Sequence, residues 1–184
     1  MVNQLLDKIN KERLKDERVL DMIEEIEVPS KTILLHEGEI STHIYFIKKG
    51  CLRAWFNKDG KDISLQFFFE GQAIASIDSF LNNLPSILNI ESIEPSSLIS
   101  ITKEDFEYLN RNYPELKDDF HNLLFRRFRN YVSLFLSRIK DSPQERYADL
   151  INNHPEIIKR VPQHYIASYL GITPISLSRI RNRK

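Results

Sequence analysis

The 184-residue sequence has a single cysteine, Cys51, so one chain can neither form an internal disulfide nor supply the several thiolates of an iron–sulfur cluster. No apolar run approaches the roughly 20 residues that cross a bilayer. The charged N-terminus, MVNQLLDKINKERLKDER, lacks the uninterrupted apolar stretch of a secretory signal. These absences predict a cytoplasmic protein that makes no membrane contact.

Signatures of common enzymes are also missing. No Gly-Xaa-Ser-Xaa-Gly or P-loop pattern occurs, so we expect no enzymatic activity and no catalytic residue. The remaining enzyme hypothesis is a cupin-like metal enzyme, whose ligands would come from His36, Glu37, Glu39 and His43. Cupins space their first histidines as His-Xaa-His, whereas six residues separate His36 from His43, and the next histidine is His121. We therefore expect no metal site.

Positive and negative residues balance at 26 each, but their distribution is uneven. Glu156 is the last acid, and six Lys or Arg residues follow it, so the segment from Ile157 carries about +6 and residues 1–156 about −6. A basic module joined to an acidic body indicates that the module meets a polyanion. A basic tail that only aids solubility is the alternative.

Hydrophobic periodicity divides roughly the first hundred residues into a helix followed by strands. Apolar residues recur every three or four positions over residues 3–27, which predicts a helix. Short β-branched runs over residues 32–101, with an Asp59-Gly60 hairpin turn, predict an antiparallel sandwich or barrel. A short helical turn is expected at residues 75–83.

A long amphipathic helix is predicted over Leu116–Lys140, after a shorter one over Lys103–Tyr113. Apolar side chains recur along the long helix at spacings of 4, 4, 3 and 4, a seam wide enough for a coiled coil. Further apolar residues widen this face, so we expect a homodimer; packing of both sides within one subunit is the alternative. The seam consists of Phe120, Leu124, Phe128, Tyr131 and Phe135.

The segment VPQHYIASYLGITPISLSRIRNRK divides into two short helices around Gly171. Gly171 can adopt the positive φ of a tight turn, and Thr173 is a good N-cap for the second helix. Leu177 and Ile180 would face inward and leave a polar outer face. This pattern is typical of a helix-turn-helix whose second helix enters the major groove; a helical hairpin that only packs on the body is the alternative.

Ser176 and Arg179 are the predicted base-reading residues, because we expect them to face outward near the start of the second helix. Arg suits guanine O6 and N7. Contacts to phosphates would hold the register and make affinity dependent on salt. Their predicted donors are Gln163, Thr173, Arg181, Arg183 and Lys184.

The order of these elements and two motifs resemble the Crp/Fnr family of transcription regulators. The motif HEGE(x)5YFIKKG, over residues 36–50, looks like the start of a cyclic-nucleotide-binding β-roll. The tail RVPQHYIASYLGITPISLSRIR is similar to the short-ended regulators of this family common in Bacteroidetes. The resemblance covers nearly the whole chain and implies an α+β fold. Its parts would be an N-terminal antiparallel β-roll, double-stranded and jelly-roll-like, flanked by helices, then a long dimerisation helix and a C-terminal helix-turn-helix.

The resemblance also implies a homodimer that reads a palindromic operator on double-stranded DNA, with half-sites about one helical turn apart. RNA polymerase is a further partner that the family would bring. We therefore expect a sensor domain over residues 1–115, a dimerisation helix over 116–141, and a helix-turn-helix domain without a wing over 142–184.

The effector pocket is where the sequence departs from the family. There a carboxylate binds the ribose hydroxyl and an Arg pairs with the cyclic phosphate, whereas Ser76 and Ser86 stand at these two positions of the cassette EGQAIASIDSFLNNLPSILNIES. A buried phosphate would lack its charge partner, so the sequence argues against cyclic AMP or cyclic GMP, and no cofactor is expected. An uncharged or polar small-molecule effector and a pocket without a ligand both stay open. Polar side chains that could line the pocket are those of Ser76, Asp78, Ser79, Asn82, Asn83 and Ser86.

The predicted function is thus sequence-specific DNA binding that a small effector controls through the β-roll. The alternative is a β-roll sensor or interaction protein that signals through protein partners without binding DNA. The cupin-like metal enzyme is a remote third hypothesis.

Overall fold

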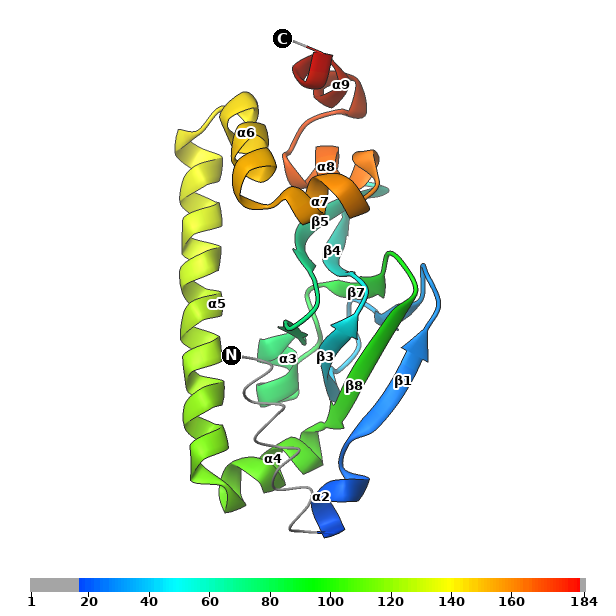
Figure 1. Ribbon diagram of the computed structural model, residues 1–184, viewed down its shortest axis with the longest axis vertical. Helices are drawn as coiled ribbons and strands as arrows, with labels where there is room; N and C mark the ends of the chain where they lie inside the picture. Colours follow the sequence, from blue (N-terminus) through cyan, green and yellow to red (C-terminus); the bar gives the residue numbers. More distant parts are fainter. Residues whose placement is uncertain (1–16, 183–184) are drawn as a thin grey trace. The chain divides into compact units, whose positions relative to one another are not determined.

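A computed structural model describes residues 17–182, and within this range eight β-strands form two four-stranded sheets (Figure 1). The strand order is β1-β8-β3-β6 in one sheet and β2-β7-β4-β5 in the other. Strand β8 pairs antiparallel with β1 and β3, and β7 with β2. The strands are β1 (Glu24–Val28), β2 (Ile33–Leu35), β3 (His43–Lys49), β4 (Leu52–Lys58), β5 (Lys61–Phe68), β6 (Ala73–Ile74), β7 (Asn89–Ser92) and β8 (Ser96–Thr102).

Helices precede, interrupt and follow the strands, which confirms the predicted α+β class with an antiparallel β-roll. The described helices are α2 (Glu17–Asp21), α3 (Ile77–Asn82), α4 (Lys103–Asn112), α5 (Pro114–Lys140), α6 (Pro143–Asn153), α7 (Pro155–Arg160), α8 (Gln163–Tyr169) and α9 (Pro174–Asn182).

The chain forms two compact units, and each combines separate segments. Unit 1 contains the described residues up to Arg53 together with Phe68–Arg127, and unit 2 contains Ala54–Phe67 and Phe128–Lys184. Most of the hairpin formed by β4 and β5 therefore belongs to the same unit as the C-terminal helices. The functional division at residues 115/116 and 141/142 stays a prediction, because compactness describes packing and not function.

Strand β1 corrects the predicted helix over residues 3–27, which was wrong at its C-terminal end. Residues 3–16 of that helix lie outside the described part of the chain, and α2 covers Glu17–Asp21. Glu24–Val28 instead pair with β8, with Ile26 opposite Leu98. Glu and apolar residues alternate toward the end of this segment, and a neighbouring strand with a free edge outweighs the helical spacing of its isoleucines.

The hairpin turn between β4 and β5 has the predicted geometry. Asp59 and Gly60 both have positive φ, 53° and 76°, as a two-residue type I′ turn requires. The Gly60 N–H donates to Asn57 Oδ1 at 3.0 Å. Helix α3 likewise confirms the helical turn expected at residues 75–83, whereas the two-residue strand β6 was not predicted.

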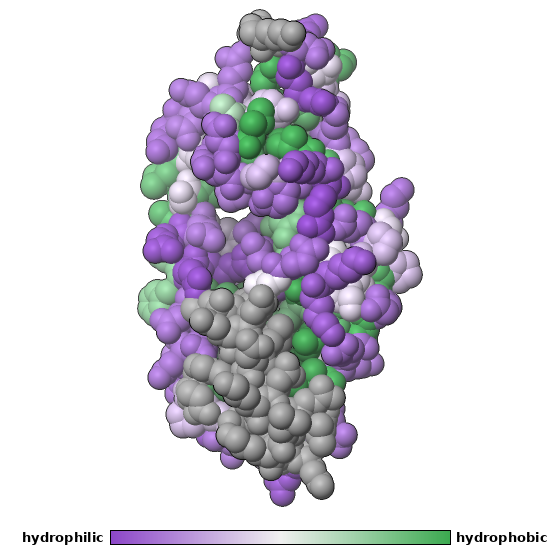
Figure 2. All heavy atoms as spheres, in the orientation of Figure 1, coloured by the Kyte–Doolittle hydropathy of each residue, from purple (hydrophilic) through white to green (hydrophobic). Residues whose placement is uncertain are grey.

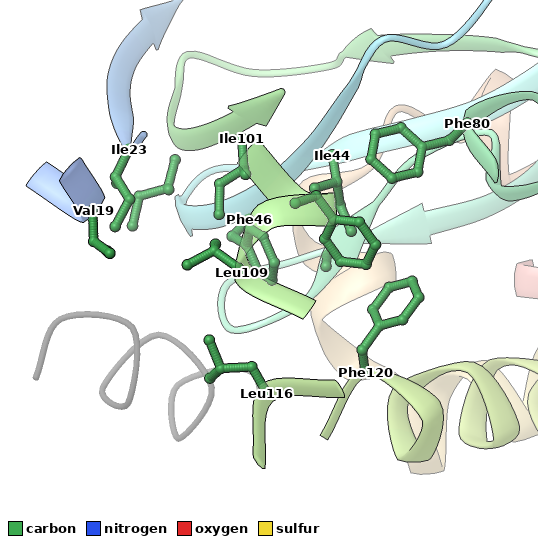
Figure 3. Close-up of a cluster of buried hydrophobic side chains, with 12 residues drawn as sticks. Val19, Ile23, Ile44, Phe46, Phe80, Ile101, Leu109, Leu116 and Phe120 are labelled. Carbon is green, nitrogen blue, oxygen red and sulfur yellow. The ribbon is translucent and has the colours of Figure 1, made fainter. Parts of the chain in front are cut away.

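The core of unit 1 gathers apolar side chains from the β-roll and from α2, α4 and α5 (Figure 3). The Phe106 ring lies 5.3 Å from Phe80 and 4.4 Å from Phe120, both edge-on, an arrangement worth about 1 kcal/mol per pair beyond area burial. Phe120 is 5% exposed and Leu124 packs against the same cluster. The predicted dimer seam was therefore wrong at the buried Phe120, whereas Leu124 is only partly buried and its place in the seam stays a prediction.

Arg127 attaches the first part of α5 to the strands of unit 1. Its Nη2 donates to the Ala73 carbonyl at 2.7 Å, and its guanidinium carbon lies 4.6 Å from the centre of the Phe68 ring. The second contact has the geometry of a cation–π interaction. Together with Phe120, it fixes which face of α5 is used within the subunit.

Side-chain caps start helices α4 and α6. Thr102 Oγ1 accepts a hydrogen bond from the Asp105 N–H at the start of α4. At α6, Ser142 Oγ accepts from the Glu145 N–H at 3.3 Å, and the Glu145 carboxylate accepts from the Ser142 N–H at 2.7 Å. This capping box lowers the pKa of Glu145, because the hydrogen bond from the Ser142 backbone favours the carboxylate.

Gly50, between β3 and β4, gives the first testable prediction. Its φ is +109°, and a Cβ there would lie 2.7 Å from the Ser96 Cα, too close for the backbone to accept. We expect Gly50→Ala to lower the free energy of unfolding by about 3 kcal/mol in urea denaturation. Gly60→Ala is the matched control: nothing lies within 4 Å of that Cβ, so only the left-handed backbone should cost about 1 kcal/mol. Equal losses in the two variants would contradict the steric account.

Candidate nucleic-acid interface and effector pocket

The two predicted C-terminal helices are present as α8 and α9. Gly171 between them has a φ of +69°, and Thr173 Oγ1 accepts a hydrogen bond from the Ser176 N–H at 3.1 Å, so Thr173 caps α9. Ala167 and Leu177 are almost fully buried at 0% and 1% exposure, which brings the helices into contact. These local features confirm the two helices, the turn at Gly171 and the cap at Thr173 that the sequence predicts.

The outer face of α9 differs from the prediction at one residue. Ser176 is half-buried, and its Oγ lies 3.0 Å from Thr173 Oγ1, so it belongs to the cap and was wrongly placed on the outer face. Ile175 is 67% exposed instead. Residues three and four apart share one side of a helix, and Ile175, Ser178, Arg179 and Asn182 are all exposed.

Ile175 was missed because an isoleucine at helical spacing is normally assigned to the core. A signal existed in the sequence: with Leu177 and Ile180 on the inner side, position 175 falls on the opposite one. The predicted phosphate donors Gln163, Thr173 and Arg181 are exposed. Arg183 and Lys184 lie outside the described residues, so their positions stay predictions.

Two arginines hold the end of α8 within unit 2. Arg138 Nη2, from α5, donates to the Tyr169 carbonyl at 3.0 Å, and Arg146 Nη2, from α6, donates to the Leu170 carbonyl at 2.7 Å. The last carbonyls of a helix lack partners within it, so cationic donors are favourable there. Burial raises the pKa of the Tyr169 hydroxyl, partly offset by the charge of Arg138.

In unit 1, the two serines at the family's ligand-binding positions bind each other. Ser76 and Ser86 are 5% and 3% exposed, and their Oγ atoms lie 2.9 Å apart. Ser86 Oγ also lies 2.6 Å from the Leu88 carbonyl oxygen. Both hydroxyls therefore have their hydrogen-bond partners within the protein and require none from a ligand.

The remaining predicted pocket residues do not converge with this pair. Ser79 Oγ is buried and accepts from the Ser41 N–H at 2.8 Å. The exposed Asp78 and Asn82 bind each other, and Asn83 Oδ1 accepts from the Lys103 ammonium at 2.8 Å. The sequence grouped these residues because they are close along the chain, but α3 points them in different directions.

A buried ion pair joins the two central strands β4 and β7. Arg53 Nε donates to Glu91 Oε1 at 2.7 Å, and the two side chains are 1% and 9% exposed. Arg53 is the only buried Lys or Arg among residues 17–182. Its charge is already matched by Glu91, so the pair offers no unmatched cation to a phosphate. The two residues are 38 positions apart, and nothing in the sequence pattern relates them.

A cavity of about 260 Å³ lies between α3 and α4 rather than at the serine pair. None of the predicted pocket residues lines it. Its lining consists of Leu81, Lys103, Phe106, Glu107, Asn110 and Arg111.

Beyond Arg127, α5 exposes much of its apolar surface, and Figure 2 shows hydrophobic side chains along the edge that α5 forms. Phe128, Tyr131 and Phe135, which the sequence assigns to the dimer seam, are 68%, 45% and 65% exposed. Four further large apolar side chains of the helix are at least 40% exposed: Phe125, Val132, Leu136 and Ile139.

The histidines considered for a metal site have other contacts. The backbone N–H of His36 donates to Glu39 Oε2, and the His43 ring stacks on Tyr45, whose hydroxyl pKa is raised by burial and by Glu24. Between residues 17 and 182, no group of three His, Cys, Asp or Glu side chains is arranged to hold a metal ion. In the same range no helix is long and apolar enough to span a membrane.

Residues 25–113 match the family of the cyclic nucleotide-binding domain. No curated protein sequence matches the chain. Among solved structures, the fold is similar to CLP, a c-di-GMP responsive global regulator of Xanthomonas campestris, with a TM-score of 0.72 and 16% identity over 89% of this chain and 87% of CLP.

Two further structures give the same result. FixK2 from Bradyrhizobium japonicum has a TM-score of 0.74 and 17% identity, covering 88% of this chain and 83% of FixK2. A protein of Eubacterium rectale assigned to the Crp/Fnr family of transcriptional regulators has a TM-score of 0.71 and 20% identity, covering 88% and 77%. Residues 25–113 thus match the family of the cyclic nucleotide-binding domain, and the chain has the fold of the Crp/Fnr transcription regulators.

Proposed function

We propose that the protein is a cytoplasmic, DNA-binding transcription regulator of the Crp/Fnr type that binds a palindromic operator as a homodimer. The observation that carries the proposal is the exposed outer face of α9, on a helix whose start is capped by Thr173 and whose inner side is buried at Leu177. Such a helix can enter the major groove without unfolding its own module. The regulators with a similar fold support the same reading.

Arg179 and Ile175 are the side chains that we assign to base edges. Arg179 can donate two hydrogen bonds to guanine, and the aliphatic Ile175 can contact a thymine methyl group. Thr173 Oγ1 is occupied by the Ser176 N–H, so its part in DNA binding is chiefly to hold the helix start. Contacts to phosphates are assigned to Gln163, Arg181, Arg183 and Lys184.

Arg179→Ala tests the proposal directly. We expect it to weaken binding to the specific operator by about 10- to 100-fold, because one bidentate Arg–guanine pair is worth about 1–3 kcal/mol of discrimination. Binding to unrelated DNA should weaken far less. Gel shifts at two salt concentrations, on a fragment upstream of the protein's own gene, measure both. Arg111→Ala, an equal charge change in unit 1, is the control.

If wild type and Arg179→Ala bind all sequences equally, specific regulation through α9 is wrong. Signalling through protein partners, possible without any DNA contact, would then be the better account. RNA polymerase would be a partner only if the operator is bound.

The dimer is assigned to a stripe along α5 that is shifted from the predicted seam. Phe125, Phe128, Val132, Phe135 and Ile139 follow one another at spacings of 3, 4, 3 and 4, the heptad spacing of a coiled coil, and each is at least 40% exposed. A single subunit leaves this stripe in water, and a second copy of the same helix has the matching pattern. Contiguous apolar surface of this kind is typical of an interface.

Phe135→Asp should separate the dimer. It places a charge in the middle of the apolar stripe, where burying it without a partner costs several kcal/mol, so we expect a monomer at about 10 µM by light scattering after gel filtration. Ser133→Asp adds the same charge to an exposed position of α5 beside the stripe and should stay dimeric. A wild-type protein that is monomeric at this concentration would contradict the assignment.

We further propose that the β-roll does not respond to cyclic AMP or cyclic GMP. The pair Ser76–Ser86 supports this, since both hydroxyls are buried and bound to each other where the family uses a carboxylate and an Arg. The one buried cation, Arg53 among residues 17–182, is matched by Glu91. A cyclic phosphate in the roll would be desolvated without an opposite charge.

Calorimetric titration with cyclic AMP measures this. We expect no saturable heat up to about 1 mM nucleotide, because loss of a buried charge partner costs a few kcal/mol of binding energy, and no change in operator affinity. The double variant Ser76→Glu/Ser86→Arg should gain measurable affinity if only the two missing groups prevent binding. Micromolar binding to the wild type would show the serine account to be wrong.

A further inference from the structure

The β4–β5 hairpin docks on the end of α8 inside unit 2. Ser168 Oγ accepts the Ser64 N–H at 2.9 Å and donates to the Asp62 carbonyl at 2.7 Å. Beside it, the Tyr169 ring lies 5.4 Å from the Phe67 ring. A strand of the sensor roll is therefore bound directly to the helix that precedes the turn at Gly171.

The chemistry of this contact requires a hydroxyl at position 168. Among residues 17–182, β5 is the last strand of its sheet, so no described strand pairs with one of its two sides. A serine can donate one hydrogen bond and accept another at the same time. The Ser168 hydroxyl accepts from the Ser64 N–H and donates to the Asp62 carbonyl, two residues apart on β5. A neighbouring strand would bind these backbone groups in the same way. An alanine side chain can neither donate nor accept a hydrogen bond.

Three contacts thus converge on three consecutive residues. The hairpin binds Ser168, Arg138 of α5 binds the Tyr169 carbonyl, and Arg146 of α6 binds the Leu170 carbonyl. Arg138 and Arg146 reach the pair from α5 and α6, which precede α7 and α8 in the sequence. Ser168 and the ring contact between Tyr169 and Phe67 connect the pair to the β4–β5 hairpin, and Ser168 does so across a separation of 106 residues to Asp62.

Docking leaves the outer face of α9 free. With Ser168 bound to the hairpin, Ile175 is still 67% exposed, and Ser178 and Arg179 are exposed too. The docked arrangement is therefore compatible with DNA in contact with α9, and it restricts the orientation of α8 and α9 before DNA arrives. Restricting a module in its binding orientation raises its affinity, because less freedom is lost on binding.

We propose that Ser168 is a positioning residue through which the β4–β5 hairpin of the sensor holds the α8–α9 pair in its DNA-reading orientation. The inference rests on the proposed DNA binding and adds the route by which the β-roll acts on it. Ser168 itself touches no DNA, so its effect on affinity must be independent of salt.

Three variants test whether Ser168 positions the α8–α9 pair: Ser168→Ala, Ser168→Thr and, as a control, Ser133→Ala at an exposed position of α5. Hydrogen exchange of the Ser64 amide reports the docking contact without DNA, and operator affinity at several salt concentrations reports the consequence. In Ser168→Ala we expect the Ser64 amide to exchange at least tenfold faster and operator affinity to fall about tenfold, as loss of one or two net hydrogen bonds implies. The slope of log affinity against log salt should not change. Ser168→Thr keeps the hydroxyl and should restore both values, and Ser133→Ala should alter neither.

Each other result overturns the inference. Faster exchange at Ser64 with operator affinity within twofold of wild type means that docking has no bearing on DNA. Unchanged exchange means that Ser168 does not hold the hairpin. A salt slope reduced by about one unit means that Ser168 contacts a phosphate instead. Failure of the wild type to prefer any DNA sequence would refute the proposed function itself, and the Ser64 exchange would still tell whether the contact exists.

Discussion

Much of this structure depends on how α5 divides its apolar surface between its own subunit and solvent. Up to Arg127 the helix belongs to unit 1, with Leu116 and Phe120 buried at 3% and 5% exposure. Beyond Arg127 no side chain of the helix is fully buried, and Phe128, Phe135 and Ile139 are each at least 65% exposed. A stripe of this kind is costly in water, and association removes the cost. Dimerisation, as proposed, is thus what makes the second half of α5 stable as a helix.

In the β-roll, by contrast, the polar groups at the predicted ligand-binding positions have their hydrogen-bond partners within the protein. The hydroxyls of Ser76 and Ser86 bind each other, and Arg53 is bound to Glu91. A binding site gains affinity when the ligand supplies partners that the free protein lacks. The two serines lack nothing, so an effector at this place would have to break their hydrogen bond and replace it. This requirement disfavours any ligand recognised chiefly by its negative charge.

Local features could be predicted from the sequence, and long-range ones could not. Caps at Thr102, Ser142 and Thr173, and the turn at Asp59-Gly60, depend on residues within three positions, and all are present. Strand β1 was predicted as part of a helix because its partner β8 lies about 70 residues further on. The spacing of apolar residues within a segment does not show that the edge of β8 is available for pairing.

The errors at the candidate site have the same origin. Periodicity shows that Phe120 faces along one stripe of α5, but not whether that stripe meets the core or a second subunit. The prediction placed Ser176 rather than Ile175 on the outer face of α9. The cap formed by Thr173 uses the hydroxyl and the backbone N–H of Ser176, and a pattern of polar and apolar residues does not reveal this hydrogen bonding. The contact between Ser168 and Ser64 spans 104 residues and was not foreseen.

The residues at which the chain leaves unit 1 explain how the β-roll could act on α8 and α9 at all. The chain crosses between the units after Arg53, before Phe68 and after Arg127. Arg53 is bound to Glu91, and the Arg127 guanidinium lies over the Phe68 ring, so the crossing points are themselves held by charge and cation–π contacts within unit 1. A change of packing inside the roll can reach unit 2 through these backbone continuations. Two of the three crossings are the two ends of the β4–β5 hairpin, to which Ser168 binds. The third crossing lies within α5, the helix that carries Arg138. Since coupling requires an element that both sites bias, the proposed action of the β-roll on α8 and α9 would depend on the hairpin and on α5.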